Sequence, residues 1–259
     1  MIRRIAILAA VTVVLLVTSG LPSAQDGEQQ YLEFRTYQLS SAAELPKVDT
    51  YLEKGLLPAL GRQGIDTVGV FAEQAPEGAS NVYLLIPFSS IEQFSAMQGK
   101  LDADTAYQEA AAEYFNTPQE SPRFSRIESE LMLSFAAWPR VTVPEQKKQG
   151  KPRLFELRSY ESHTEKMGAL KVEMFNSGEV PIFLDCDIQP VFMGRVLSGP
   201  KMPNLTYMTV YSDEDHLKEA WAKFGPHPDW LELREVEKFK GTVSKIHMVQ
   251  LTPRPYSDF

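Results

Sequence analysis

The sequence predicts an α+β protein whose folded part consists of two tandem copies of one unit, each with the element order β-α-β-β-α-β. The first observation is a repeat: residues 32–37 (Leu-Glu-Phe-Arg-Thr-Tyr) recur as residues 155–160 (Phe-Glu-Leu-Arg-Ser-Tyr), 123 positions later. The second is that alternating and helix-spaced apolar residues follow in the same order after both segments. The same offset, without a gap, relates Gly55 to Gly178, Pro58 to Pro181, Ile65 to Ile188, Val68 to Val191, Asn81 to Asn204 and Ser89 to Ser212.

The first 24 residues are predicted to be a secretory signal peptide and not part of the fold. Arg3 and Arg4 form a short positive region, residues 5–17 are apolar, and Ser23 and Ala24 offer small residues for cleavage. The apolar run is shorter than the ~20 residues that a membrane-spanning helix needs, which disfavours the alternative of a retained anchor. We therefore expect an extracytoplasmic protein, periplasmic or secreted, that does not span the membrane after cleavage.

The first half of the repeating unit is easiest to follow in the second copy. Residues 155–160 alternate in polarity as a strand does, and residues 167–175 carry apolar side chains at helical spacing until Gly178 interrupts them. Residues 188–197 and 205–211 are rich in β-branched and aromatic side chains, and the turn-rich segment between them predicts a hairpin.

The second half of the unit begins with a helix start signal. Ser212 or Asp213 is the predicted N-cap of a helix that runs to Phe224, and a last strand is expected over residues 243–251. This order is the ferredoxin-like arrangement, in which helices cover one face of an antiparallel sheet. The predicted boundaries are a first unit at residues 30–137, a linker at 138–151 and a second unit at 152–252.

The predicted sheets have a second face that the helices leave uncovered. Strand alternation places Glu156, Arg158 and Tyr160 on one face, and Phe155 and Leu157 on the other. We expect the two apolar residues to face the helices and the polar three to face a cavity between the copies. The copies then either pack sheet against sheet or join their edges into a barrel.

Several segments of the second copy resemble one known family. They are residues 155–160, Met-Phe-Asn-x-Gly-Glu at 174–179, Pro-Val-Phe at 190–192, Leu-Thr-Tyr-Met at 205–208, and Trp-x-x-Phe-x-x-His-Pro-Asp-Trp at 221–230. These segments resemble the NIPSNAP family, in particular its tandem, secreted bacterial branch.

The resemblance covers the second copy almost end to end and the first less well, where Asp-Thr-Ala-Tyr at 104–107 replaces His-Pro-Asp-Trp at 227–230. It implies a dimeric α/β-barrel fold, related to small monooxygenases and isomerases and formed here within one chain. It implies no particular reaction, because the family has no agreed catalytic residues to carry over. Eukaryotic members are associated with mitochondria and protein contacts, a role that an exported protein need not share.

The repeated Glu-x-Arg-x-Tyr pattern supplies the main candidate site residues. An arginine held beside a glutamate inside a cavity can bind a carboxylate or polarise a carbonyl group. The alternative is a structural ion pair, because buried charges in proteins are usually paired. The candidates are Glu33, Arg35 and Tyr37 in the first copy and Glu156, Arg158 and Tyr160 in the second.

Two histidines are further candidates, since their charge changes near neutral pH. His227 can act as an acid or base or simply precede a helix that starts at Pro228, and His247 can line the cavity or belong to the core or rim. The four histidines form no helical pair, and Cys186 is the single cysteine, so no metal and no disulfide are expected. No cofactor motif is present either.

Charge and composition limit the classes of molecule that the protein is expected to bind. The formal net charge of −8 argues against nucleic acid as a partner, which needs clustered lysine and arginine. The sequence favours a small-molecule ligand in the cavity between the two units, with the activity itself not established. The alternative is a non-catalytic extracytoplasmic protein-interaction module. The sequence is also compatible with a homo-oligomer. A roomy polar cavity would favour the first hypothesis, and a cavity filled by Phe, Met and Trp the second.

Overall fold

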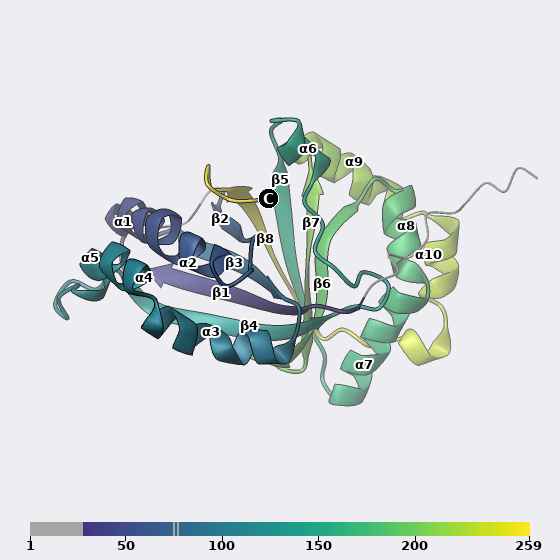
Figure 1. Cartoon of the computed structure of the whole chain (residues 1–259). Coiled ribbons are helices and arrows are strands. Elements are labelled where there is room, and N and C mark those ends of the chain that lie inside the picture. The colour runs from purple at the N-terminus through teal and green to yellow at the C-terminus, as the bar shows by residue number, and fades with distance from the viewer. Residues whose placement is uncertain (1–27, 75, 77) are drawn as a thin grey trace, which may run out of the picture.

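The computed structural model describes residues 28–74, 76 and 78–259, and its strands form one closed antiparallel barrel (Figure 1). The predicted signal peptide lies outside the described residues, and within them no helix is long and apolar enough to cross a membrane. The eight strands are β1 (Tyr31–Leu39), β2 (Gly69–Glu73), β3 (Asn81–Phe88), β4 (Phe124–Ser134), β5 (Leu154–Glu161), β6 (Gln189–Ser198), β7 (Asn204–Tyr211) and β8 (Lys245–Pro253).

The two halves of the chain contribute four strands each and join at their edges. The barrel order is β1-β3-β2-β8-β5-β7-β6-β4, so the first half forms the run β4-β1-β3-β2 and the second the run β8-β5-β7-β6. The halves meet where β2 pairs with β8 and β4 pairs with β6. Of the two packings left open by the sequence, joined edges are therefore the one that forms, and no edge is left unpaired among the strands of the described residues.

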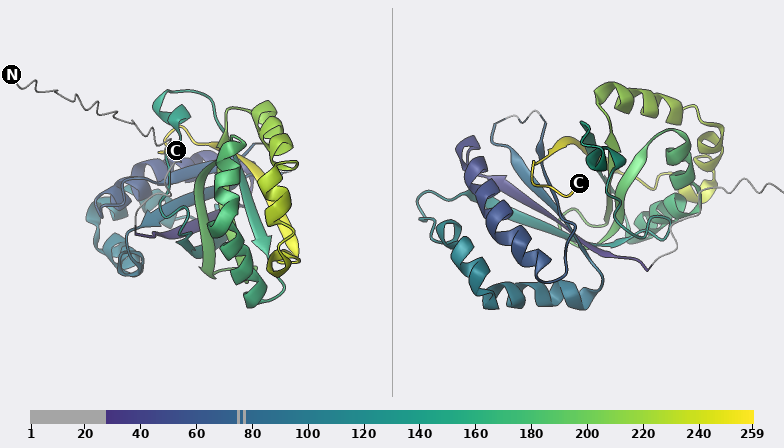
Figure 2. Two further views of the ribbon diagram at one scale, coloured as in Figure 1. Left: turned by 90° about the vertical axis from the view of Figure 1, so that its right-hand side faces the viewer. Right: turned by 45° about the horizontal axis from the view of Figure 1, so that its top comes forward.

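Helices cover the outside of the barrel in two groups on opposite sides (Figure 2). Several helices begin at side-chain caps: Ser90 accepts a hydrogen bond from the backbone of Gln93, and Asp213 accepts one from His216. The first group is α1 (Leu45–Tyr51), a π-helix (Leu52–Leu56), α2 (Leu57–Gly61), α3 (Ile91–Ala103), α4 (Thr105–Ala110) and α5 (Ala112–Phe115). The second is α7 (Glu165–Met174), a π-helix (Phe175–Glu179), α8 (Val180–Asp185), α9 (Glu214–Phe224) and α10 (Pro228–Leu233).

Three separate hydrophobic cores hold these layers together. One lies between the first helix group and its strands, and includes Tyr37, Val48 and Leu56. A second lies between the other helix group and its strands, where the free Cys186 is buried as a small apolar side chain. The third fills the inside of the barrel with side chains such as Phe155 from strands of both halves.

The expected orientation of the Glu-x-Arg-x-Tyr strands is wrong. Phe155 and Leu157 point into the barrel, whereas Tyr160 packs in the helix-side core and Glu156 accepts a hydrogen bond from Trp221 of α9. Alternation shows which residues share a face of the strand. It cannot say which of two buried faces lines the barrel interior and which faces the helices. The interior of an eight-stranded barrel is just wide enough for packed side chains or one small ligand, so apolar residues suit most of it. The charged pair instead lies where a helix supplies a donor.

One end of the barrel is closed by the segment that joins the halves and by the C-terminal residues (Figure 2). Val141 and Val143 pack against the barrel core, and a short helix, α6 (Glu145–Lys148), follows them. Phe259 is fully buried with its ring centroid 6.3 Å from that of Phe71. The segment predicted as a linker thus packs on the barrel and caps it.

Candidate functional site: the open mouth of the barrel

A cavity of about 220 Å³ occupies the other end of the barrel, and we call it the mouth cavity. Its walls come from β1, β3 and β4 of the first half and from β5, β7 and β8 of the second. The turn between β6 and β7 adds Pro200 and Lys201 at the rim. The cavity therefore lies between the two halves of the chain.

The mouth cavity has an apolar floor and polar walls because the side chains inside the barrel change character along the strands. On β1 the interior positions run from Leu32 through Phe34 to Thr36. Strand pairing then sets Thr36 opposite Glu128 on β4, and sets Ser159 of β5 opposite Thr206 on β7. An amphipathic ligand can lay its apolar part on the floor and its polar part against the walls.

Glu130 is an acidic group on the wall of this cavity. Its carboxylate accepts hydrogen bonds from Thr206 Oγ1 at 3.0 Å and from Asn204 Nδ2 at 3.4 Å. Partial burial raises its pKa above the usual range for glutamate, and the hydrogen bond from Thr206 offsets only part of that effect. Glu130 can therefore hold a proton where an exposed glutamate would be ionised, which suits a group that exchanges protons with a ligand.

His247 is the one predicted candidate that the structure brings to the mouth cavity. It stands opposite Ser159 on the barrel wall, and its Nε2 lies 2.5 Å from Oε1 of Glu161. Both side chains of this pair are partly exposed at the rim. A histidine and two further carboxylates, Glu128 and Glu130, thus line one cavity.

In the second half, the predicted Glu156 and Arg158 form a complete and closed arrangement beneath α9. Arg158 Nε and Nη2 donate to the two oxygens of Glu156 at 2.8 and 3.1 Å. Trp221 Nε1 donates to Glu156 at 2.9 Å, and the guanidinium carbon of Arg158 lies 3.7 Å from the centre of the indole ring. Tyr160 hydrogen-bonds Tyr207 at 2.8 Å. These groups satisfy one another, so the geometry favours a structural role.

The first half repeats the pair with different neighbours. Arg35 donates to both oxygens of Glu33 at 2.8 and 2.9 Å, and its third contact is a long one to Tyr37 at 3.4 Å. Ser129 of β4 also donates to Glu33 at 2.9 Å. This pair too lies on the helix side, away from the mouth cavity.

His227 lies apart from all these groups. It is the N-cap of α10, where Nδ1 accepts a hydrogen bond from the backbone of Asp229 at 3.3 Å, and Pro228 takes the first helical position. The geometry at this position therefore fits the helix-start interpretation.

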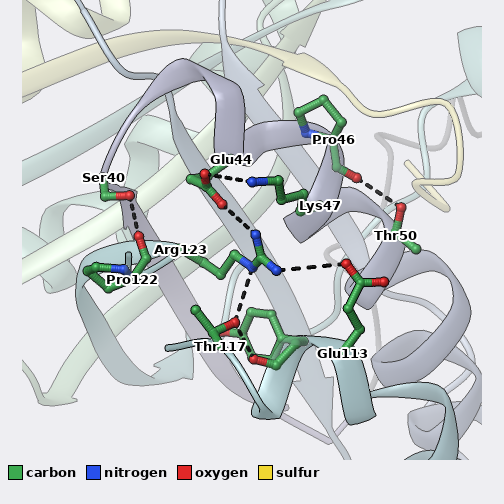
Figure 3. A network of polar contacts seen from close by, with 10 residues as sticks. Ser40, Glu44, Pro46, Lys47, Thr50, Glu113, Thr117, Pro122 and Arg123 are labelled. Carbon is green, nitrogen blue, oxygen red and sulfur yellow. Dashed lines mark hydrogen bonds and ion pairs between the residues drawn. The ribbon is translucent and has the colours of Figure 1, made fainter. Parts of the chain in front are cut away.

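A second hollow of about 220 Å³ lies on the outside of the first half, between α1 and α5. Arg123 runs along it and contacts Glu44 at 2.9 Å, Thr117 at 3.1 Å and Glu113 at 3.7 Å (Figure 3). Lys47 in turn contacts Glu44 at 2.9 Å. Because its charged groups pair with each other, this hollow offers a ligand less than the mouth cavity does.

Comparison with known proteins identifies the family. The NIPSNAP family model matches residues 32–137 and again residues 155–258. The chain belongs to the NIPSNAP family. No curated protein has a sequence that matches this NIPSNAP chain.

Solved structures share its fold at low sequence identity. A candidate monooxygenase from Fusobacterium nucleatum subsp. nucleatum ATCC 25586 is 10% identical with a TM-score of 0.55, over 87% of this chain and 93% of that one. A candidate monooxygenase from Lactobacillus acidophilus NCFM is 8% identical with a TM-score of 0.52, over 87% and 94%. An anthrone oxidase-like protein is 10% identical with a TM-score of 0.54, over 90% and 93%. These likenesses establish an α/β-barrel fold and no more.

Sequence reasoning missed most of the residues that line the mouth cavity of this NIPSNAP protein. Glu128 and Glu130 alternate with Ser129 on β4, and a charged alternation of this kind usually marks a solvent-exposed face. Ser159 and Thr206 lie in strands that were already predicted, yet their hydroxyl groups gave no motif. Only the pairing of strands from both halves brings these side chains together.

Proposed function

We propose that this NIPSNAP protein is exported and binds a small molecule in the mouth cavity between its two halves. The observation that carries the proposal is Glu130, a carboxylate with a raised pKa on the wall of a cavity with an apolar floor. Pockets that bind small molecules combine mainly apolar walls with a few converging polar groups, and perturbed acids gather at such sites. Glu130 is the group that we expect to exchange a proton with the ligand.

The architecture behind this proposal is a tandem one. We propose that residues 30–137 and 152–252 are duplicated ferredoxin-like units that form an intramolecular counterpart of a dimeric α/β-barrel. In support, β3 and β7 and the two π-helices keep the 123-residue offset of the repeat at both ends. An experimental structure checks this: β1 must superpose on β5 with Glu33 on Glu156.

The fold neighbours are compatible with chemistry in such a barrel. Two of them are described as candidate monooxygenases and one as anthrone oxidase-like. Fold alone does not carry an activity across such low identity, so our proposal stops at ligand binding with proton exchange.

Export rests on the N-terminal residues. Arg3 and Arg4, the apolar residues 5–17 and the small residues Ser23 and Ala24 follow the layout of a cleaved signal peptide. N-terminal sequencing of secreted protein should begin near Gln25. Recovery of the intact N-terminus in a membrane fraction would contradict the proposal.

Ligand binding is tested by blocking the mouth cavity. Thr36 lies on the wall of the cavity, so Thr36→Phe fills it, whereas Ser95→Phe adds the same ring to an exposed position of α3. A fragment screen by ligand-observed NMR, with native mass spectrometry of protein from its own source, should find ligands that bind wild type and Ser95→Phe but not Thr36→Phe. Ligands that bind all three proteins equally would place the site elsewhere.

The protein-interaction alternative has one observation of its own. Ile246 and Met248 of β8 are 47% and 60% exposed, although both are large and apolar, and Met248 also borders the mouth cavity. Neighbouring apolar side chains that are exposed together mark surfaces that contact other proteins. An Ile246→Glu variant, which leaves the mouth cavity unchanged, would favour this alternative if it changes the sedimentation of the protein, and unchanged sedimentation would count against a contact between copies.

A further inference from the structure

The charged side chains around the mouth cavity are the first indication of the chemical class of ligand that it binds. Glu128 and Glu130 stand two residues apart on β4, so both side chains point into the barrel. Neither takes part in any of the ion pairs among the described residues, whereas the neighbouring Glu161 is paired with His247. Two carboxylates without a directly bonded counter-ion thus face one small cavity, and the positive charge of Lys201 acts on Glu130 from a greater distance.

Aromatic rings form the wall next to these carboxylates. Phe34 and Tyr83 line the cavity with their ring centroids 5.8 Å apart and their planes tilted by 30°. The face of an aromatic ring attracts a cation, and carboxylates and ring faces together are the groups that hold organic ammonium ions. A neutral ligand could donate a hydrogen bond to these carboxylates but would lack the charge attraction, and an anionic ligand would be repelled.

A buried acceptor without a partner is an independent sign of a missing donor. Asn204 is 5% exposed, and its Nδ2 donates to Glu130 and Ser159, which both line the cavity. Its Oδ1 is buried and has no hydrogen-bond partner among the described residues. Buried polar atoms are nearly always paired, so the hydrogen-bond network directly behind the cavity wall has room for one more donor.

We infer that the mouth cavity binds a small organic cation, an ammonium group carried on an apolar or aromatic body. The inference rests on the proposed function, because it names the ligand class of the same cavity. The ammonium group donates to Glu128 and to Glu130, which releases its proton to solvent as the cation binds, and the body lies against Phe34 and Leu157 on the floor. The exposed Lys201 at the rim opposes a cation and therefore provides a sensitive test.

The test compares three probes of one size and different charge: benzylammonium, benzyl alcohol and benzoate. Each is titrated into isotope-labelled protein that begins at Gln25, and the dissociation constant is read from amide shifts around the cavity. We expect benzylammonium to bind about tenfold more tightly than benzyl alcohol, the scale of one charge-assisted hydrogen bond. Benzoate should bind most weakly.

Variants assign the preference to named groups. The double variant Glu128→Gln/Glu130→Gln should remove the tenfold preference for benzylammonium, whereas Glu235→Gln, at an exposed position, should keep it. Lys201→Ala should strengthen benzylammonium binding several-fold because it removes a like charge.

Two results would overturn the inference. If benzoate binds most tightly and Lys201→Ala abolishes its binding, the cavity is an anion site, and the proposed function still stands. If benzyl alcohol and benzylammonium bind equally, charge plays no part, and again only the ligand class fails. The proposed function fails separately, when no fragment distinguishes Thr36→Phe from Ser95→Phe.

Discussion

The two halves of the chain carry the same Glu-Arg pair and surround it with different groups. In both halves the arginine Nε lies 2.8 Å from the glutamate, on the side of the strand that faces the helices. In the second half Trp221 stacks on Arg158, and the equivalent position of the repeat in the first half is the exposed Gln98.

A second buried ion pair marks the same contrast. Lys171 Nζ lies 2.6 Å from Glu179, with both side chains almost fully buried, and the equivalent positions in the first half are Val48 and Leu56. The comparison teaches that this fold accepts either a buried ion pair or an apolar pair at one place. The Glu-Arg pair occurs in both halves and is the constant feature of the strand.

The mouth cavity shows the halves diverging in another way. Strand pairing makes Glu130 of β4 the counterpart of Val249 on β8, and Glu128 the counterpart of His247. The first half therefore supplies the two unpaired carboxylates, and the second supplies an apolar side chain and a histidine. Because the two halves differ at these positions, the two walls of the mouth cavity differ in charge and polarity.

The largest expected effect comes from breaking the buried ion pair of the second half. Lys171→Val or Glu179→Leu alone should lower the free energy of unfolding by about 3–5 kcal/mol, because each leaves one buried charge without its partner. The double variant copies the first half and should cost far less than the two single changes together. Urea unfolding of the four proteins measures this coupling.

The matched control is Glu173→Gln on the same helix, whose exposed carboxylate pairs with Lys238. It should change stability by less than about 1 kcal/mol. A double variant as unstable as the sum of the singles would contradict the idea that apolar and ionic pairs are interchangeable here.

An intermediate effect on stability is expected at the helix position that contacts the Glu-Arg pair in the second half and differs in the first. Trp221→Phe removes the indole donor from Glu156 while Arg158 stays bonded, so it should cost about 1–3 kcal/mol. Gln98→Ala, at the equivalent exposed position, should stay within about 0.5 kcal/mol. Thermal unfolding compares the two, and equal effects would show that Trp221 acts through general packing alone.

The smallest effect is a pH dependence that comes from the first half. Because the pKa of Glu130 is raised by burial, its protonated form adds stability at low pH, and this is lost as pH rises through the folded-state pKa. The stability of wild type relative to Glu130→Gln should therefore fall as pH rises from about 4.3, the ordinary glutamate pKa. Denaturant unfolding at several pH values measures it. A relative stability that rises with pH would mean that the pKa is lowered.

The sequence by itself determined the repeat, the order of strands and helices, and the family. Those features follow from local patterns: polarity alternation over residues 155–160, helical spacing over 167–175, and cap residues such as Asp213, which is indeed the N-cap of α9. Each of these signals depends only on residues that are close together in the sequence.

Only the tertiary structure decided which face of each strand is the barrel interior and which side chains share the mouth cavity. Both faces of β5 are buried, so alternation alone could not assign Phe155 to the inside and Glu156 to the helix side. Glu130 and Thr206 are 76 positions apart and meet only because the edges of the two halves pair. Barrel closure is a long-range event, and no local pattern in the sequence encodes it.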